Sequence, residues 1–304
     1  MKRFLTTILT GIFVLLSCSV VCAKSVGVIM SGDIPYYQDI HKSFMDNVSG
    51  FFKEQGIEVV VQKPVPENMS WTNAARKLVT IGSEVIISYG AAATLTTMKA
   101  TSDIPILFAG VYDPQAMQMT GKNATGVSST VPVDTVLKRL SSIKKISKLG
   151  IILSKSEKDS ILQTKEIKGS EGTFGFSSVL ITIQDGVNKD SITGVDAIVL
   201  TTCAAAMVNV KDIIDVARRD KLLTAALLGG AENEGVVLTV MVSPEEQGKK
   251  LADIVKKVLG GSKPSDISVT QPKELVTIIN MKEAQSLGIT IPANVKGSAT
   301  KVIE

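Results

Sequence analysis

Glu84-Val85-Ile86-Ile87-Ser88-Tyr89-Gly90 decides the fold, because this short apolar run ends in a turn of small residues. The following segment, 92–101, has helical spacing, and residues 104–109 form a second short apolar run. A strand, a helix and another strand in this order predict a βαβ unit, in which the two strands lie parallel in one sheet. Their nearly continuous apolar character is typical of strands that helices cover on both faces.

The same alternation extends in both directions from this unit. Further strands are expected at 26–30, 57–62, 149–154, 178–183, 197–202 and 222–228. Further helices are expected at 37–55, 70–81, 160–169 and 211–220. Because the pattern stops near residue 110 and restarts near residue 149, it predicts an α/β protein with two Rossmann-like lobes, each built on a parallel sheet. One larger sheet is the alternative.

The C-terminal part adds an amphipathic helix and another short α/β pattern. In residues 244–260, Leu251, Ile254 and Val255 lie on one side, and lysines lie on the other. A strand is expected at 277–280, followed by a helix at 281–287.

The N-terminal residues have the features of a secretory signal peptide. Lys2 and Arg3 precede an apolar run, and Val21-Cys22-Ala23 fits the small-residue rule for cleavage. We therefore expect residues 1–23 to be removed and the protein to be exported to the periplasm. The alternatives are a membrane anchor and lipoprotein processing at Cys18.

Composition narrows the classes of function. The chain has 304 residues, one histidine, three cysteines and a net charge of +4, which falls to +2 without the signal peptide. Zinc sites need several nitrogen or sulfur ligands, and nucleic-acid binding needs a basic surface. The hydrolase, phosphate-loop and dinucleotide motifs are absent. We expect a binding protein and no enzyme, with no metal, no cofactor and no nucleic-acid partner. Cys203, the one cysteine left, is expected to be buried.

The ends of the predicted strands mark the candidate ligand-binding residues. In open parallel α/β sheets, ligands lie beyond the carboxyl ends of the strands, where helix N-termini also suit a carboxylate. Tyrosines near these ends can stack on a planar ligand. Turn chemistry and helix capping are the alternatives for single residues, Asp113 above all. The candidates are Ser31, Gly32, Tyr36, Tyr89, Gly90, Ala91, Gly110, Tyr112, Asp113, Ser154, Thr202, Gly230 and Glu232.

Three segments and the 244–261 helix carry a resemblance to a known family. The segments are Glu274 to Pro292, then Ile104-Pro105-Ile106-Leu107-Phe108-Ala109-Gly110-Val111-Tyr112-Asp113-Pro114, and Asn123-Ala124-Thr125-Gly126-Val127-Ser128. Together they resemble the ABC-transporter substrate-binding proteins grouped around the tryptophan/tyrosine-type binders. Ser128 joins the candidate ligand-binding residues.

The resemblance implies the periplasmic binding protein type I fold, with two lobes, three hinge crossovers and a ligand between the lobes. On that pattern one lobe comprises 25–130 plus 243–270, and the other 131–242 plus 271–304. The implied function is that of a monomeric solute-binding component of an ABC importer. It captures an amino-acid-like or planar aromatic ligand and delivers it to a permease in the inner membrane.

The chain departs from the family at three places that bear on the ligand. It has Thr202-Cys203-Ala204 where amino-acid binders tend to carry polar or acidic side chains, and alanines where they tend to have Thr or Ser after Gly90. The segment after Gly229 is short and lacks an aromatic residue. These departures are evidence against unmodified tryptophan or tyrosine as the ligand. Because a buried α-amino group needs a carboxylate partner, Asp113, Glu232 or Glu234 is the expected source.

Two other functions stay open at this point. A ligand sensor that docks a membrane receptor would have the same lobes. A hydrolase that uses the carboxylates of Asp113 and Glu232 is the less favoured alternative.

Overall fold

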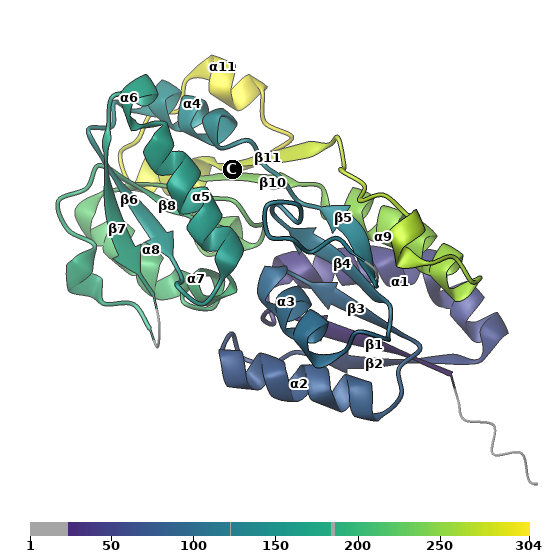
Figure 1. The fold of residues 1–304 in the computed structure, drawn as a ribbon. Helices are drawn as coiled ribbons and strands as arrows, with labels where there is room; N and C mark the ends of the chain where they lie inside the picture. Colours follow the sequence, from purple (N-terminus) through teal and green to yellow (C-terminus); the bar gives the residue numbers. More distant parts are fainter. Residues whose placement is uncertain (1–23, 122, 184–185) are drawn as a thin grey trace, which may run out of the picture.

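The computed structural model describes residues 24–304 except 122, 184 and 185, and it shows a two-lobed α/β protein (Figure 1). The expected signal peptide, residues 1–23 with Cys18, lies outside the described residues. Among the described helices, none combines the length and the apolar character needed to cross a membrane. Each lobe contains one sheet, so the prediction of two separate sheets is confirmed.

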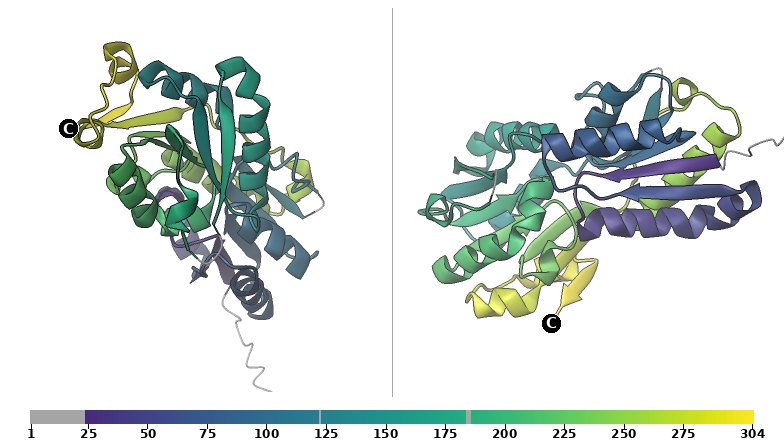
Figure 2. Two further views of the ribbon diagram at one scale, coloured as in Figure 1. Left: turned by 90° about the vertical axis from the view of Figure 1, so that its left-hand side faces the viewer. Right: turned by 90° about the horizontal axis from the view of Figure 1, so that it is seen from below.

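The first lobe is built on a parallel sheet. Its strands are β1 (Lys24–Met30), β2 (Ile57–Gln62), β3 (Val85–Tyr89), β4 (Ile106–Val111) and β5 (Ala124–Ser128), in the spatial order β2-β1-β3-β4-β5. Helices α1 (Pro35–Gln55) and α9 (Pro244–Leu259) cover one face, and α2 (Asn68–Thr80) and α3 (Ala91–Ala100) cover the other (Figure 2). Because helices cover both faces, the central strands are buried along their whole length.

Helices α1 and α9 pack against each other although they are far apart in the sequence. Helix α1 begins with Pro35 and ends at Gly56, whose φ of 64° is a left-handed conformation that favours glycine. A Cβ on Gly248 of α9 would lie 2.6 Å from the backbone oxygen of Ile40 and from the backbone nitrogen of Phe44. The two helix backbones therefore approach too closely at Gly248 for a side chain to fit between them.

The second lobe is built on a larger sheet with one antiparallel pair. Its strands are β6 (Lys148–Leu153), β7 (Ser177–Thr182), β8 (Ala197–Leu200), β9 (Leu223–Ala226), β10 (Leu238–Val242), β11 (Leu275–Asn280) and β12 (Lys301–Ile303), in the order β12-β11-β10-β9-β8-β6-β7. Strands β10 and β11 pair antiparallel, and the other neighbours are parallel.

The helices of the second lobe lie on both faces of its sheet. One apolar core joins the sheet to α4 (Val133–Ile143), α5 (Lys158–Gly169) and the tail helices α10 (Met281–Ser286) and α11 (Ala293–Gly297). The opposite core joins it to α7 (Ala204–Val208) and α8 (Val210–Asp220). Short helical turns complete the lobe at α6 (Glu171–Phe174), Lys189–Ser191 and Ala231–Asn233, and a further one, Pro264–Asp266, follows α9.

Several elements differ from what the periodicity predicted, among them strands β5 and β12 and the short helices α6 and α11. Strand β10 and helices α4 and α7 fall in segments where the sequence analysis placed no element. Strand β10 continues an apolar run that begins at Val236, so the sequence does not mark where the strand begins. Helix α7 consists largely of alanines, which give no apolar periodicity.

The chain passes between the lobes three times, and the buried Tyr36 and the partly exposed Glu246 hold these crossovers together. The hydroxyl of Tyr36 donates to the backbone oxygen of Val242 (3.0 Å) and lies 2.8 Å from the hydroxyl of Ser129. Burial raises the pKa of Tyr36 to about 12. The carboxylate of Glu246 accepts hydrogen bonds from the N–H groups of Lys273 and Glu274 on the third crossover. The hinge is therefore cross-linked by specific polar contacts.

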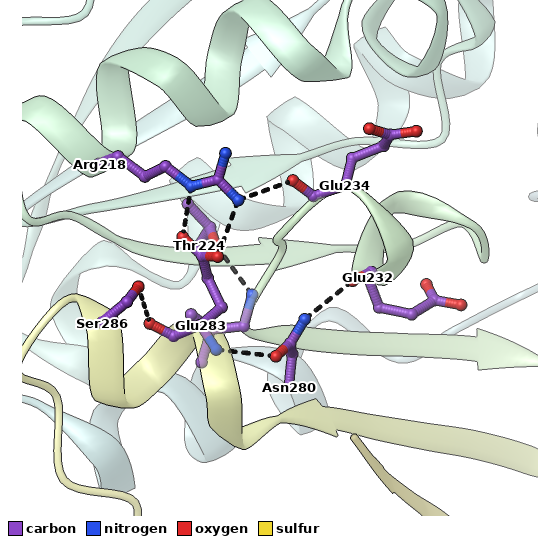
Figure 3. Close-up of polar contacts among 8 residues, drawn as sticks. Arg218, Thr224, Glu232, Glu234, Asn280, Glu283 and Ser286 are labelled. Atoms are coloured by element: carbon purple, nitrogen blue, oxygen red, sulfur yellow. Dashed lines mark hydrogen bonds and ion pairs between the residues drawn. The ribbon is translucent and has the colours of Figure 1, made fainter. Parts of the chain in front are cut away.

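The C-terminal tail is fixed to the second lobe by a cluster of polar contacts (Figure 3). Arg218 of α8 binds both carboxylate oxygens of Glu283, each at 2.8 Å. The side chain of Asn280 accepts from the N–H of Glu283 and donates to the backbone oxygen of Glu232. The tail thereby joins the lobe through charge-assisted and capping hydrogen bonds.

Replacing Arg218 with Ala is expected to lower the free energy of unfolding by about 1–2 kcal/mol, because the nearly buried Glu283 carboxylate loses its charged partner. The partial exposure of Arg218 keeps the effect from being larger. Arg219→Ala is the matched control, since Arg219 pairs with its neighbour Asp220 on the surface. Urea denaturation measures both variants, and equal small shifts would contradict the role of the Arg218 pair.

Candidate ligand-binding site between the lobes

The carboxyl ends of the two sheets face each other, and the lobes touch there. A Cβ on Gly32, after β1, would lie 3.1 Å from the Cβ of Ala204 in the second lobe. The hydroxyl of Tyr112, after β4, donates to the carboxylate of Glu166 on α5. Leu162 of α5 packs against an apolar cluster of the first lobe. The described conformation is therefore one in which the lobes are in direct contact.

Two buried carboxylates begin helix α5 at this interface. Glu157 precedes the helix and is 1% exposed. Its carboxylate accepts hydrogen bonds from the N–H groups of Ala204 (2.9 Å) and Ala205 (3.0 Å) and from the thiol of Cys203 (3.3 Å). Burial raises the pKa of Glu157, while the two backbone N–H groups lower it. Glu157 thus braces the start of α7 from the start of α5.

Asp159 is the less satisfied of the two carboxylates. One oxygen accepts from the N–H of Ser160 (3.0 Å), and the other, Oδ2, has no hydrogen-bond partner among the described residues. Burial raises the pKa of Asp159 well above its usual range, and the charge of Glu157 raises it further. The N–H of Ala91, in the first lobe, acts in the opposite direction. In the part of the chain that the structure describes, neither acid forms an ion pair.

Tyr37 of the first lobe faces this acidic pair with a free hydroxyl. The side chain is fully buried, and its hydroxyl has no hydrogen-bond partner among the described residues. Burial raises the pKa of Tyr37, followed by the charges of Asp159 and Glu157. Gly90, with a φ of 86°, lets the hydroxyl approach, since a Cβ there would lie 2.4 Å from it. We call Tyr37, Glu157 and Asp159 the acid site.

Polar side chains of the second lobe hold helix α5 in place. The amide of Gln163 donates to the hydroxyl of Thr202 and accepts from its N–H, both at 2.6 Å. The hydroxyls of Ser160 and Thr201 lie 2.6 Å apart. These contacts tie α5 to the end of β8, so the position of the acid site is fixed by the fold.

Several predicted residues lie around the acid site. The hydroxyl of Ser31 accepts from the N–H of Ala93, and a Cβ on Gly90 would lie 2.5 Å from that hydroxyl. A Cβ on Gly110 would lie 3.0 Å from the ring of Tyr37. Gly32 and Ala91 face the second lobe at Ala204 and Asp159, as described above. The structure thus brings together Ser31, Gly32, Gly90, Ala91 and Gly110.

The other predicted residues are engaged elsewhere. Asp113 accepts from the N–H of Ala116, which is a turn cap, and Glu232 accepts from Gly230 and Thr239 inside the second lobe. Glu234 lies 3.9 Å from Lys211 at the surface. The hydroxyl of Ser154 contacts that of Ser156. The other candidates are Tyr36 at the hinge, Tyr89 with His41, Tyr112 with Glu166, Thr202 with Gln163, Gly230 beside Pro35, and Ser128, whose buried hydroxyl has no described partner.

Reasoning from the sequence missed Glu157 and Asp159, and it considered Tyr37 only among the tyrosines that could stack on a planar ligand, without choosing it as a candidate. Asp113, Glu232 and Glu234 have the other partners given above, and the two buried carboxylates at this interface belong to residues just past Ser154. The available signal was the segment Ser154-Lys155-Ser156-Glu157-Lys158-Asp159, which places two acids directly after a buried strand. Among the described residues no cluster of three or more acids, histidines or cysteines has the arrangement of a metal site.

The ligand-free protein is expected to lose stability with rising pH through Asp159. Above the usual pKa of an aspartate the unfolded chain releases its proton, but the folded chain holds it because its pKa is raised. Asp159→Asn lacks this titration, so its melting temperature should exceed that of the unaltered protein by a margin that grows from about pH 5 to about pH 8. Thermal unfolding across this range measures the margin, and a constant margin would contradict the expectation.

Two α/β lobes joined by three crossovers, with a buried polar site between their strand ends, define the periplasmic binding protein type I class of fold. The chain belongs to the ABC transporter substrate binding protein family, whose model matches residues 41–303.

The names of individual similar proteins agree with this family assignment. A tyrosine-binding protein of Clostridioides difficile is 23% identical over 278 residues, covering 87% of this chain and 81% of the relative. The ABC domain from Streptococcus pneumonia in complex with L-Trp has a TM-score of 0.86 at 22% identity, and covers 92% of this chain and 99% of its own. A ligand-free, open structure of a Clostridium difficile substrate binding protein has a TM-score of 0.65 with the same coverage and identity.

Proposed function

We propose that this chain is the extracytoplasmic solute-binding component of an ABC importer. It captures a small amino-acid-like or planar aromatic ligand between its lobes and delivers it to a permease of the inner membrane. The family supports the role in binding, and the ligands named for two relatives, L-Trp and tyrosine, support a ligand with an amino group. Export by residues 1–23 to the periplasm and action as a monomer are parts of the same proposal.

The acid site is the single observation that carries this proposal. It offers the unpartnered Oδ2 of Asp159 and the unpartnered hydroxyl of Tyr37, both buried where the two lobes meet. A buried carboxylate without a cation is costly, so such a site is typical of a place that a ligand completes. A protonated amine supplies donors to both oxygens and is enclosed when the lobes close.

We propose that the lobes comprise 25–130 plus 243–270 and 131–242 plus 271–304. The packing of α9 on α1 and the bridge between Val127 and Thr270 support the assignment of 243–270 to the first lobe. The crossovers held by Tyr36 and Glu246 then form the hinge, about which the lobes open and close around the ligand.

Calorimetric titration with amino acids, nucleobases and small aromatic acids and amines tests the proposal, together with solution X-ray scattering. A ligand should bind with a measurable affinity and reduce the radius of gyration by closing the lobes. If no compound binds and the scattering is unchanged throughout, the proposed function loses its support.

Tyr112→Phe is expected to weaken ligand binding by about 3- to 10-fold, because it removes the hydrogen bond from Tyr112 to Glu166 across the closed lobes. The ligand would then have to close a protein whose closed state is less stable. Titration of Tyr112→Phe, Glu166→Ala and the double variant measures the contribution of this contact. Additive losses in the double variant would show that the two side chains do not act together.

A further inference from the structure

We infer that the ligand is an organic cation that lacks a carboxylate, such as a primary amine, and that Asp159 selects against amino acids. This inference rests on the proposed function and narrows its ligand class. It follows from the charges at the acid site and from the hydrogen-bond donors around it.

The charges at the acid site are of one sign. Glu157 and Asp159 are each 1% exposed and share the interface with the hydroxyl of Tyr37 and the thiol of Cys203. The histidine and the lysine near this edge of the first lobe are already engaged: His41 contacts the hydroxyl of Tyr89, and Lys63 pairs with Asp33 at 2.9 Å in an exposed position. A cationic ligand therefore favours the ionised form of Asp159, whereas a zwitterion brings a third carboxyl group into the site.

Four of the backbone donors that could receive a ligand carboxylate are directed at groups of the protein. The first turn of α3 is the helix start that faces the second lobe, but its Ala91 N–H lies near enough to Asp159 to lower the pKa of that acid, and its Ala93 N–H donates to the hydroxyl of Ser31. In the second lobe, the N–H groups of Ala204 and Ala205 donate to Glu157. A ligand carboxylate would have to displace a carboxylate of the protein and remain beside it.

The acceptors, by contrast, are free. The Oδ2 atom of Asp159 and the hydroxyl of Tyr37 have no partners among the described residues, and an ammonium group has three donors to offer. The site thus matches the amino end of an amine, and a ligand carboxylate would find in it only the hydroxyl of Tyr37 as an unpartnered side-chain donor among the described residues.

Matched pairs of compounds test this inference on the full protein after unfolding and refolding to remove bound solutes. Tryptamine is compared with L-tryptophan, and tyramine with L-tyrosine, by isothermal titration calorimetry. At least one amine should bind about tenfold or more tightly than its amino acid. Asp159→Asn should weaken the amine about tenfold or more and strengthen the amino acid, because the start of α3 is then free to bind a carboxylate. Asp134→Asn, at an exposed aspartate that contacts Ser170, is the control and should leave the order unchanged.

The outcomes separate the inference from the proposed function. An amino acid that binds more tightly than its amine, or an order that Asp159→Asn leaves unchanged, overturns the inference and leaves the proposed function standing. Absence of binding by all four compounds, with unchanged scattering, counts against the inference and the proposed function together. Binding of an amino acid alone to both forms of the protein would show that Asp159 does not set the charge of the ligand.

Discussion

Replacing Glu157 with Ala is expected to lower the free energy of unfolding of the ligand-free protein by about 2–4 kcal/mol. The N–H groups of Ala204 and Ala205 would lose their acceptor at the start of α7, and the thiol of Cys203 would lose its partner. Each buried donor left without an acceptor contributes its own desolvation cost. The substitution would therefore destabilise α7, which lies on the second lobe's side of the interface.

Asp159→Asn is the matched comparison and should change stability in the opposite direction, by about 1–2 kcal/mol near neutral pH. Asp159 has one oxygen without a partner and lies beside another acid, so the folded state keeps its proton near neutral pH, at a cost in free energy that asparagine does not have. Urea denaturation of the two variants, only two residues apart, measures both effects. A loss of stability in both would show that the two acids serve the fold alike, and the assignment of Asp159 to the ligand would fail.

Gly126→Ala is expected to lower the free energy of unfolding by more than about 3 kcal/mol, because overpacking at this site is severe. A Cβ on Gly126 in β5 would lie 2.1 Å from the backbone oxygen of Phe108 in β4 and 2.7 Å from its backbone nitrogen. A backbone cannot rotate away as a side chain can, so the two strands would have to separate. The pairing of β4 with β5, which lies next to the site, would be lost when the strands separate.

Gly50→Ala is the control for this substitution. Gly50 lies on the exposed side of α1, and a Cβ there would meet no atom within 4 Å. Alanine should raise stability by about 0.5–1 kcal/mol, because glycine costs conformational entropy in a helix. Denaturation midpoints and the yield of folded protein measure both variants. A Gly126→Ala protein as stable as the unaltered one would show that β4 and β5 can be moved apart at little cost.

The sequence predicted much of the fold because apolar residues recur with one period in strands and with another in helices. Strands β1 to β4 of the first lobe and the amphipathic helix α9 were identified within a few residues of their bounds, whereas β5 was not predicted. The antiparallel pairing of β10 with β11 could not be read in this way, since periodicity shows that a strand exists and says nothing of its neighbour. Helix α7 was missed because a run of alanines has no periodic apolar face.

The candidate site was predicted less completely, for a different reason. Ligands lie beyond the carboxyl ends of parallel strands, and this rule identifies residues such as Ser31 and Gly90, which directly follow a strand. The structure places these two residues at the interface. Glu157 and Asp159 lie one helical turn further on, where acids ordinarily serve as caps. Tyr37 lies inside a helix. Their common burial arises only when two lobes meet, and local sequence does not contain that contact.

The close crossing of α1 and α9 has a consequence for the order in which the protein is made. Residues 35–55 leave the ribosome long before residues 244–259. The apolar side chains of Ile40, Phe44 and Val48 are therefore not covered by α9 while the second lobe's strands up to β10 are synthesised. The first lobe is therefore completed only after most of the second lobe has been made, and the nascent chain has no finished first lobe until most of its length exists. Such late completion suits a polypeptide that is to be threaded across a membrane before it folds, as the proposed leader at residues 1–23 would require.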